Sequence, residues 1–227
     1  PDCQAIIKKA ASRRLGEKYG VSWLPETGAK YQLQFSIMND RVQLYLDTSG
    51  PGLHKRGYRA IGNDAPLHET LAAGMIQLTR YRGREFFWDP FCGSGTIPIE
   101  AALIAKNRAP GLHRDFTASK WPGFDPVMWA RVKDEARARE FRGDYRIFAS
   151  DIDPAAVELS KKNAYLAGVA DSVKCFRKNA LEISAPGRRA TIVTNPPYGE
   201  RLMTVSEVEG LYRAMGRHFK TLAPWQI

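Results

Sequence analysis

Polar side chains follow three apolar runs of the chain, each at the point where the run stops. "FFWD" ends at Asp89, "IFASD" ends at Asp151, and "TIVTN" ends at Asn195. The residues after Asn195 are two prolines, which cannot donate to a sheet ladder, so a strand must stop there. Parallel strands end at one edge of a sheet, so these three side chains can converge on one polar ligand. Asn-Pro and Pro-Pro are also common in ordinary turns, so the third motif by itself leaves both interpretations open.

The segment "DPFCGSGT" (89–96) joins the first of these runs to a helix. Its glycines at 93 and 95 allow the backbone to pass close to a ligand, with helix N–H groups pointing at it. A phosphate-binding P-loop would need a lysine directly after the glycines, and none occurs before Lys106, which excludes ATP binding by this route. A dinucleotide-binding loop would need a glycine where Pro98 stands and an acidic residue about 20 residues farther on, whereas Asp151 is 56 residues beyond Gly95. NAD binding is therefore only weakly indicated, although an insertion could lengthen this gap.

S-adenosylmethionine is a third ligand that uses such a loop, and its methionine end carries an ammonium and a sulfonium but no phosphate. Asp89 is placed to attract that positive charge, and Asp151 can accept hydrogen bonds from ribose hydroxyls. Ile152 is expected to pack on the face of the adenine ring, and Asn179 is expected to form a hydrogen bond with the adenine amine. The glycine loop alone is a weak signal, but with Asp151 and "NPPY" in this order it is specific. The predicted cofactor residues are Asp89, Pro90, Phe91, Gly93, Gly95, Thr96, Asp151, Ile152, Asn179 and Ala180.

Strands and helices alternate from residue 60 onward. We expect strands at 85–90, 146–150, 173–176 and 190–194, and helices at 66–78, 96–106, 154–168 and 205–222. Pro66 suits a first helical turn, and Asp153 can cap the helix that Pro154 begins. Such alternation predicts an α/β fold, a mostly parallel sheet with helices on both faces. The last residues, "APWQI", are typical of entry into a fifth strand, so the sheet is expected to lack its closing strands.

The first 50 residues have a different pattern. Apolar side chains at 2–20 share one helical face, and two alternating runs, 31–37 and 42–46, flank the turn residues Asn39 and Asp40. One helix and one hairpin are too small for a stable domain, and the chain opens on a helix without an initiator Met, so we expect upstream residues. Residues 47–59, rich in glycine and basic side chains, are typical of a linker.

The composition narrows the class of protein and its partners. The 227 residues are 44% hydrophobic and carry a net charge of +10. This excess of positive charge favours binding to polyanions, nucleic acid above all. No apolar run approaches the roughly 18 residues of a membrane span. Three scattered cysteines are typical of free thiols in the cytoplasm, and the four histidines form no metal-binding pattern, so no metal is expected.

Three motifs in combination resemble those of a known family. "DPFCGSGTIPIE" (89–100), "TNPPYG" (194–199) and "DTSGPGLHKRGYR" (47–59) are similar to motifs of the RNA methylase family related to bacterial ribosomal RNA guanine-N2 methyltransferases. The resemblance covers most of the chain. It implies a Rossmann-like class I methyltransferase sheet at 60–227, without its closing strands, preceded at 1–59 by the later half of an RNA-binding THUMP domain and its linker. It also implies S-adenosylmethionine as cofactor and RNA, in particular ribosomal RNA, as partner.

In that family the "NPPY" motif holds the exocyclic amine that is methylated, and Asn195, Pro196, Pro197 and Tyr198 all match it. The lone pair of such an amine is delocalised into the base, so two acceptors must draw its N–H bonds towards tetrahedral geometry. Asn195 can supply a side-chain acceptor, and Pro196 a backbone carbonyl whose direction the two imides fix. Tyr198 can stack on the base once it has left the helical stack.

Basic side chains in the linker and in a long insertion, 107–140, are the candidate RNA contacts. The insertion mixes cations with aromatic residues, as substrate-channel loops do, but its rings could equally pack as a lid: Phe116, Trp121, Phe124 and Trp129. The basic side chains at 131–139 are more typical of a helix face that is exposed to solvent. The basic side chains at 8–14 resemble those of a THUMP surface, but they could also simply be exposed to solvent. The predicted RNA-binding residues are Lys55, Arg56, Arg59, Arg108, Arg114 and Lys120.

The expected reaction is methylation of guanine N2, with rivals left open. Adenine N6 in DNA or RNA, guanine N2 in transfer RNA, and a protein glutamine could be methylated through the same motif. Carbon methylation of cytosine would need a nucleophilic cysteine near the fourth strand, and none follows Cys175, so it is excluded. Cys92 is expected to be a small packing residue. A catalytically silent RNA-binding scaffold is the last alternative, which the intact motifs argue against.

Overall fold

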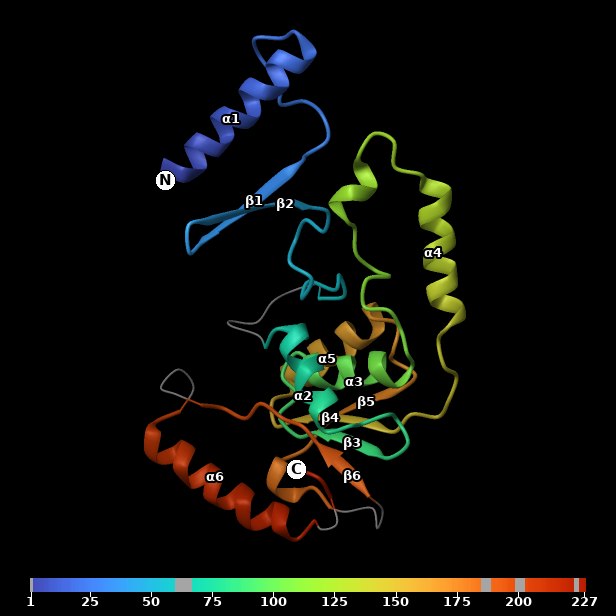
Figure 1. The fold of residues 1–227 in the computed structure, drawn as a ribbon. Coiled ribbons are helices and arrows are strands. Elements are labelled where there is room, and N and C mark those ends of the chain that lie inside the picture. The colour runs from blue at the N-terminus through green and yellow to red at the C-terminus, as the bar shows by residue number, and fades with distance from the viewer. Residues whose placement is uncertain (1, 60–66, 185–188, 199–202, 223–224) are drawn as a thin grey trace.

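The computed structural model describes residues 2–59, 67–184, 189–198, 203–222 and 225–227. Figure 1 shows two regions: a sheet flanked by helices, and an N-terminal helix and hairpin that lie apart from it. A long insertion, coloured green to yellow, leaves the first region, passes the hairpin and returns (Figure 1). The sheet region positions the candidate site, and the insertion connects it with the hairpin.

Within the described residues, the sheet has four parallel strands in the order β5-β4-β3-β6. Their bounds are Phe86–Asp89 for β3, Ile147–Asp151 for β4, Val173–Arg177 for β5 and Ala190–Ile192 for β6. Strands of such a sheet are covered on both faces, which explains why they appear in the sequence as short continuous apolar runs. A further parallel bridge joins Thr191 to Gln226. The end of the chain therefore joins the sheet beside β6, as its sequence predicts.

Helices cover both faces of the sheet. α2 (Glu69–Leu78), α3 (Thr96–Ala105) and α5 (Pro154–Leu166) lie on one face, and α6 (Val205–Lys220) lies on the other (Figure 1). Successive residues of a strand point to opposite faces. Phe87 accordingly belongs to the core beneath α2, α3 and α5, and its neighbour Trp88 to the core beneath α6. The α/β fold with a parallel sheet, predicted from the alternating pattern, is confirmed.

The helix starts follow from local capping chemistry. The Asp153 carboxylate accepts a hydrogen bond from the amide of Ala155 at 2.9 Å, and Pro154 is the first residue of α5. This confirms the predicted cap. α2 begins at Glu69, later than expected, and Pro66 lies outside the described residues. The other predicted helices and strands of the sheet region agree with the structure to within about two residues at each end.

The N-terminal region consists of α1 (Asp2–Tyr19) and a hairpin of β1 (Gln32–Met38) and β2 (Arg41–Asp47). Asn39 and Asp40 form its two-residue turn with φ of 50° and 57°, the left-handed conformation that a type I′ hairpin turn requires. None of the residues in these three elements is fully buried. The predicted elements are present, but they enclose no core within the described part of the chain.

The insertion, 107–140, contains a short 3-10 turn, η1 (Thr117–Lys120), and the helix α4 (Pro126–Ala138). Its aromatic residues are used for packing. Phe116 and Phe124 both meet Trp129 edge to face, with ring centroids 5.4 and 5.8 Å from the Trp129 ring. These contacts support the interpretation of the rings as packing residues.

Trp121, the fourth aromatic residue of the insertion, contacts the N-terminal hairpin instead. Its ring stacks on Tyr31 with centroids 4.9 Å apart, and its indole N–H donates to the carbonyl of Lys30 at 2.8 Å. Nearby, the amide of Ala118 donates to the carbonyl of Thr48 at 3.0 Å. The insertion therefore connects the hairpin to the sheet region through contacts between residues that are far apart in the sequence.

Candidate functional site

The carboxyl ends of β3, β4 and β6 bring the predicted site residues to one edge of the sheet. β3 ends at Asp89, β4 ends at Asp151, and the chain leaves β6 shortly before Asn195. The Thr194 hydroxyl donates to Asp89 Oδ1 at 2.6 Å, which ties the residue before Asn195 to the end of β3. The amide of Gly93 donates to Asp151 Oδ2 at 3.0 Å, which ties the glycine loop to the end of β4. The three strand ends therefore converge.

Asp89 is almost completely buried at this edge, with 1% of its surface exposed. Its Oδ1 accepts both the Thr194 bond and a bond from the amide of Phe91 at 3.1 Å, which leaves Oδ2 without a hydrogen bond to the described residues. Burial raises the pKa of the Asp89 carboxyl to about 7, although the two hydrogen bonds lower it, and the nearby charge of Asp151 adds to the rise. A cationic ligand would stabilise the ionised form, because opposite charges attract more strongly away from water.

The two glycines of the loop serve different purposes. Gly93 has a φ of 50°, and a Cβ built on it would meet open space, which leaves room for a ligand beside the amide that binds Asp151. Gly95 has a φ of 83°, and a Cβ there would lie 2.4 Å from Ser160 Oγ on α5. Glycine is therefore required at position 95 by the packing of α5 on the loop, and the approach of both glycines to a ligand stays a prediction.

Three other loop residues that were predicted to bind the cofactor contribute to the protein interior. Pro90 is fully buried, and Phe91 packs against the core beneath α6. Thr96 is buried, and its hydroxyl accepts a hydrogen bond from Arg59 Nη2 at 2.6 Å. The structure thus gives all three a role in building the loop, and their contact with a cofactor stays a prediction.

The end of β4 forms the side of the site predicted for the ribose and the adenine. Asp151 accepts one backbone N–H at each carboxylate oxygen, from Gly93 and, at 3.1 Å, from Asp153. Each oxygen keeps a further lone pair for a hydroxyl donor. Ile152 is 62% exposed, so an apolar surface lies next to this carboxylate. The predicted roles of Asp151 and Ile152 are compatible with this placement and stay predictions.

In the loop after β5, the predicted adenine-binding side chain also caps a helix. Asn179 Oδ1 accepts the amide of Leu181 at 3.0 Å and so caps the short 3-10 helix η2 (Ala180–Glu182). Ala180 is buried beneath it. An adenine amine donates hydrogen bonds, and Asn179 Oδ1 keeps a second lone pair that can accept one. Its predicted contact with the adenine amine stays a prediction.

Residues 195–198 continue from the end of β6. Asn195, Pro196 and Pro197 are half-buried, and the Tyr198 side chain is exposed. A rigid half-buried backbone next to an exposed ring matches what is needed to hold a flat base from its edge and its face. The segment is tied to Asp89 through Thr194, so the predicted base-binding and cofactor-binding parts adjoin.

Three polar residues that hold the site were missed by the sequence analysis. Thr194 bonds Asp89, and the fully buried Asn163 of α5 donates to the carbonyl of Ser94 at 2.9 Å. The fully buried Ser160 lies against Gly95. Buried polar side chains need hydrogen-bond partners. Serine and asparagine three residues apart on the otherwise apolar face of α5 were therefore the signal that could have revealed the contact with the glycine loop.

Two predicted RNA-binding arginines are enclosed by the insertion and the linker. Arg108 forms a bidentate ion pair with Glu140, with N···O distances of 2.9 and 2.8 Å. Arg114 is buried and donates to backbone carbonyls of the linker, those of Ser49, Pro51 and Gly52. A guanidinium engaged in this way is not free to bind a phosphate, so both residues take a structural role in place of the predicted one.

The same correction applies to two arginines of the linker. Arg56 Nη2 lies 3.5 Å from Glu100, and Arg59 Nη2 lies 3.5 Å from Glu69. Both carboxylates are buried, so each arginine balances a charge inside the protein. Lys55 and Lys120 differ from these four arginines, because their side chains are exposed. Only these two remain as candidates for RNA contact.

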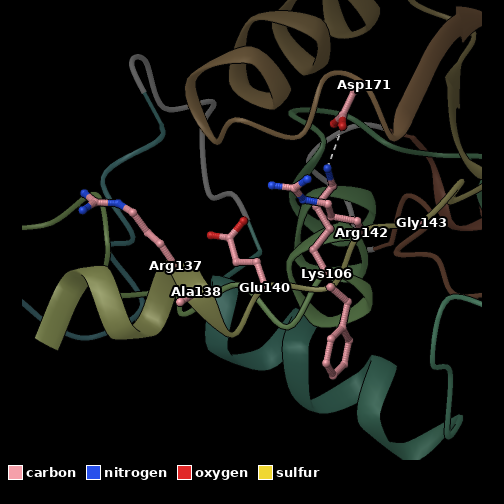
Figure 2. A pocket seen from close by; sticks show the side chains of 8 residues that line it. Lys106, Arg137, Ala138, Glu140, Arg142, Gly143 and Asp171 are labelled. Carbon is pink, nitrogen blue, oxygen red and sulfur yellow. Dashed lines mark hydrogen bonds and ion pairs between the residues drawn. The ribbon is translucent and has the colours of Figure 1, made fainter.

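A separate pocket of about 370 Å³ opens at the far end of α3. Its wall contains the ion pair of Lys106 and Asp171, at 2.7 Å, together with Arg137, Glu140 and Arg142 (Figure 2). The ten residues of α3 separate it from the glycine loop by about 15 Å, at 1.5 Å per residue. None of the predicted site residues lines this pocket, so we do not include it in the site.

Cysteine chemistry finds no support at this edge of the sheet. Burial raises the pKa of the Cys92 thiol well above its usual range, and its side chain lies in the core beneath α3. This is the environment of a packing residue, because a nucleophilic cysteine needs a lowered pKa. Within the described ranges, no cluster of three or more His, Cys, Asp or Glu side chains could hold a metal. No helix in the described part of the chain is long and apolar enough to span a membrane.

Relatives share the chain's sequence over most of its length. The family model of the RMKL-like methyltransferase domain matches residues 56–226. A Bacillus subtilis (strain 168) protein named "Putative RNA methyltransferase YpsC" is 44% identical over 231 residues, 100% of this chain and 60% of that protein. A Shewanella sediminis (strain HAW-EB3) protein, "Ribosomal RNA large subunit methyltransferase K/L", is 42% identical over 198 residues, 85% of this chain and 28% of that protein.

Solved structures share its fold. A crystal structure from Listeria monocytogenes str. 4b F2365, described as "a predicted N6-adenine-specific DNA methylase", has a TM-score of 0.93 at 44% identity and covers 99% of this chain and 60% of that one. SMU.472, "a putative methyltransferase complexed with SAH", has a TM-score of 0.89 at 38% identity and covers 98% and 59%. The chain thus spans about 60% of the length of the first of these relatives. Its α/β fold is that of class I methyltransferases, and the chain belongs to the family of RMKL-like methyltransferase domains.

Proposed function

We propose that the parent protein of this chain transfers a methyl group from S-adenosylmethionine to the exocyclic N2 amine of guanine in RNA, specifically ribosomal RNA. The observation that carries the proposal is the hydrogen bond from Thr194 to Asp89. It joins the start of "NPPY" to the carboxylate at the head of the glycine loop. The part of the site that suits a cationic cofactor therefore adjoins the part that suits an amine-bearing base.

The residues at the strand ends fit S-adenosylmethionine. Asp89 offers a buried carboxylate with one oxygen available to an ammonium group, and Gly93 leaves open space above the loop. Asp151 has lone pairs for ribose hydroxyls, and Ile152 has an exposed apolar surface for an adenine ring. When bound, the cofactor supplies an electrophilic methyl group carried on a sulfonium.

The residues after β6 fit an exocyclic amine. Asn195 Oδ1 and the Pro196 carbonyl accept its two N–H bonds, which withdraws the nitrogen lone pair from the base and directs it towards the methyl group. Tyr198 stacks on the extruded base, and such stacking is worth about 1–3 kcal/mol, which offsets part of the cost of flipping. The chemistry is then in-line transfer that depends on positioning. No strong base is needed, because the methylated ammonium is acidic and loses its proton.

We propose that the N-terminal region binds the RNA. We assign residues 1–59 to the later half of a THUMP domain and its linker, on the strength of the linker motif and the basic side chains of α1. Lys55 and Lys120, which are exposed, lie in the linker and in the insertion that contacts the hairpin. A net charge of +10 supports a polyanionic partner. Cofactor chemistry and RNA binding would thus belong to different regions.

Two alternatives use the same site. Amino-methylation of adenine N6 needs the same two acceptors, and the Listeria relative is described as acting on adenine in DNA. The Shewanella relative is named for ribosomal RNA, which together with the basic N-terminal region favours RNA. A catalytically silent RNA-binding scaffold would keep the fold, but it would not need the acceptors of Asn195 and Pro196.

The direct test offers methyl-labelled S-adenosylmethionine and the full-length parent protein separately to unmodified ribosomal RNA, transfer RNA and DNA. The labelled nucleoside is then identified by mass spectrometry. Label on N2-methylguanosine in ribosomal RNA is the expected result. Label on an adenine amine would keep the cofactor assignment and overturn the target. Cofactor binding without transfer to any nucleic acid would support the silent scaffold or a protein target.

A further inference from the structure

We propose that Arg59, in the linker, is a positioning residue for the cofactor loop 89–96, so that the linker forms part of the cofactor site. The inference rests on the proposed function, because it assumes that this loop binds S-adenosylmethionine. From its place in the basic linker, Arg59 was predicted to contact RNA. Its surroundings in the structure point instead to the loop.

Arg59 joins three segments through one nitrogen. Its Nη2 donates to Thr96 Oγ1 at 2.6 Å and to the carbonyl of Leu67 at 3.2 Å, and it lies 3.5 Å from Glu69 Oε1. Thr96 is the first residue of α3, and Glu69 is the first residue of α2. The linker, α2 and the start of α3 therefore meet at this guanidinium, directly behind the glycine loop.

The contact extends from Thr96 into the loop. Thr96 Oγ1 lies 3.3 Å from Ser94 Oγ, and the Ser94 carbonyl accepts a hydrogen bond from Asn163 of α5 at 2.9 Å. On the other side, the amide of Gly93 is held by Asp151 of β4. Three elements thus hold residues 93–96: the linker through Arg59, α5 through Asn163, and β4 through Asp151.

A loop with two glycines needs such support. Glycine loses more conformational freedom on ordering than any other residue, and a binding loop that is ordered in advance binds its ligand more tightly. Gly93 and Gly95 both have positive φ, at 50° and 83°. Release of Thr96 would free the start of α3 and the peptide groups beside Gly95, and the cofactor would then have to order them.

Arg56 provides a matched control in the same linker. It is as enclosed as Arg59, with side chains 12% and 16% exposed, and each lies 3.5 Å from a buried glutamate. Arg56 pairs with Glu100, one helical turn farther along α3 than Thr96, and donates to the carbonyl of Leu53 at 2.8 Å. It has no hydrogen bond to the described residues of the glycine loop. Loss of general linker packing should affect both arginines equally, whereas loss of loop support should affect Arg59 alone.

The experiment measures the affinity of the full-length parent protein for S-adenosylhomocysteine by calorimetry. The variants are Arg59→Lys, Arg56→Lys and Thr96→Val, and each is measured below its own unfolding temperature. A lysine keeps the charge beside Glu69 but lacks the planar fork of arginine. Thr96→Val removes the hydroxyl that links Arg59 to Ser94 and keeps the shape of the side chain. We expect about tenfold weaker binding for Arg59→Lys and Thr96→Val, from the loss of one charged hydrogen bond, and no change for Arg56→Lys.

Steady-state kinetics separate positioning from a loss of active protein. These kinetics use an RNA that the wild-type protein is known to methylate. Arg59→Lys should raise the KM for S-adenosylmethionine about tenfold and leave kcat at saturating cofactor within about twofold. The double variant Arg59→Lys/Thr96→Val should lose less affinity than the sum of the two single losses, because the two variants share the contact between Arg59 and Thr96.

The outcomes separate this inference from the proposed function. If the wild-type protein fails to bind S-adenosylhomocysteine, the proposed function itself is wrong. If the wild type binds and Thr96→Val and Arg59→Lys bind equally well, the positioning role is overturned. Equal weakening by Arg56→Lys and Arg59→Lys would also overturn it, in favour of general linker packing.

Discussion

The sheet region and the N-terminal region are built from similar sequence patterns, but they differ in what they bury. Apolar residues are clustered in the strands of both. Phe87 and Ile147 of the sheet are completely buried, whereas Phe35 and Leu44 of the hairpin are 37% and 60% exposed. A pattern thus specifies a strand or helix, but only a second layer of structure turns its apolar face into a core. The hairpin has no such layer among the described residues.

The two regions also differ in what their polar residues do. At the sheet edge, Thr194 donates a hydrogen bond to Asp89, and the amide of Gly93 donates one to Asp151. The half-buried acceptors of Asn195 and Pro196 lie beside them. The hairpin carries no comparable cluster in the described ranges. Its link to the site runs through the insertion, where Trp121 packs on Tyr31. This division predicts that stability and chemistry depend on the sheet region and on the linker residue Arg59 that supports its loop, and that α1 and the hairpin affect only the handling of RNA.

The largest expected effect is on stability. Phe87→Ala should lower the free energy of unfolding of the 227-residue chain by about 3–5 kcal/mol, since it empties a fully buried site. Leu44→Ala in the hairpin should change it by less than about 0.5 kcal/mol, because the side chain is largely exposed. Urea denaturation followed by circular dichroism measures both. A loss of several kcal/mol from Leu44→Ala in the full-length parent would show that another segment covers the hairpin.

Asn195→Ala should reduce methyl transfer by about 100–1000-fold, the cost typical of one lost electrostatic contact to a reacting group. Affinity for S-adenosylhomocysteine should stay within a few fold, because Asn195 belongs to the base side of the site. Single-turnover transfer and calorimetry measure the two quantities. A variant that transfers at the wild-type rate would remove Asn195 from its proposed role.

Binding of the cofactor should depend on pH through Asp89. Burial raises the pKa of this carboxyl to about 7, and an ammonium group binds its ionised form. Affinity should therefore be full above pH 7 and fall by up to about tenfold per unit as the pH decreases below it. For folding the sign is opposite, since a raised carboxyl pKa makes the apo chain relatively less stable above pH 7 than in acid.

Asp89→Asn is the control for this pH dependence. It keeps an acceptor for Thr194 and the Phe91 amide but carries no charge. Its affinity for S-adenosylmethionine should be lower than that of the wild type at pH 8 and nearly flat between pH 6 and 8 in calorimetric titrations. A slope that persists in Asp89→Asn would assign the titration to another group.

The smallest expected effect concerns the contact between the two regions. Trp121→Ala should speed hydrogen exchange of the backbone amides around 30–33 and 48–52 a few fold, because a stacked aromatic pair is worth only about 0.5–1.5 kcal/mol. Trp129→Ala, which removes a ring that packs within the insertion, is the control and should leave the hairpin amides less affected. Affinity for S-adenosylhomocysteine should be unchanged in Trp121→Ala. A loss of cofactor binding would contradict the proposed separation of the two regions.

Local elements were predictable from the sequence where their physics is local. Continuous apolar runs marked the buried parallel strands, and Asp153 with Pro154 marked the start of α5. The turn at Asn39 and Asp40 was expected because both residue types tolerate positive φ. The edge of the sheet where Asp89 and Asp151 meet also followed, because parallel strands must end on the same side.

Contacts between distant residues were not predictable in this way. The four arginines looked like RNA contacts, because a basic residue in a loop has the same appearance whether it faces solvent or a buried glutamate. The need for glycine at position 95, where a Cβ would meet Ser160 of α5, also depends on packing between distant residues. Trp121 gave no sign of its partner Tyr31, since the two lie far apart in the chain.

The sequence by itself determined the order of strands and helices, the polar residues at the strand ends and the chemistry that they can support. Periodicity, capping and strand ends depend on neighbouring residues, so these features could be inferred without the fold. The tertiary structure alone decided which charges are paired inside the protein, which glycine faces open space and which linker arginine holds the cofactor loop. Those features depend on which surfaces pack together, and packing joins residues that the linear sequence keeps apart.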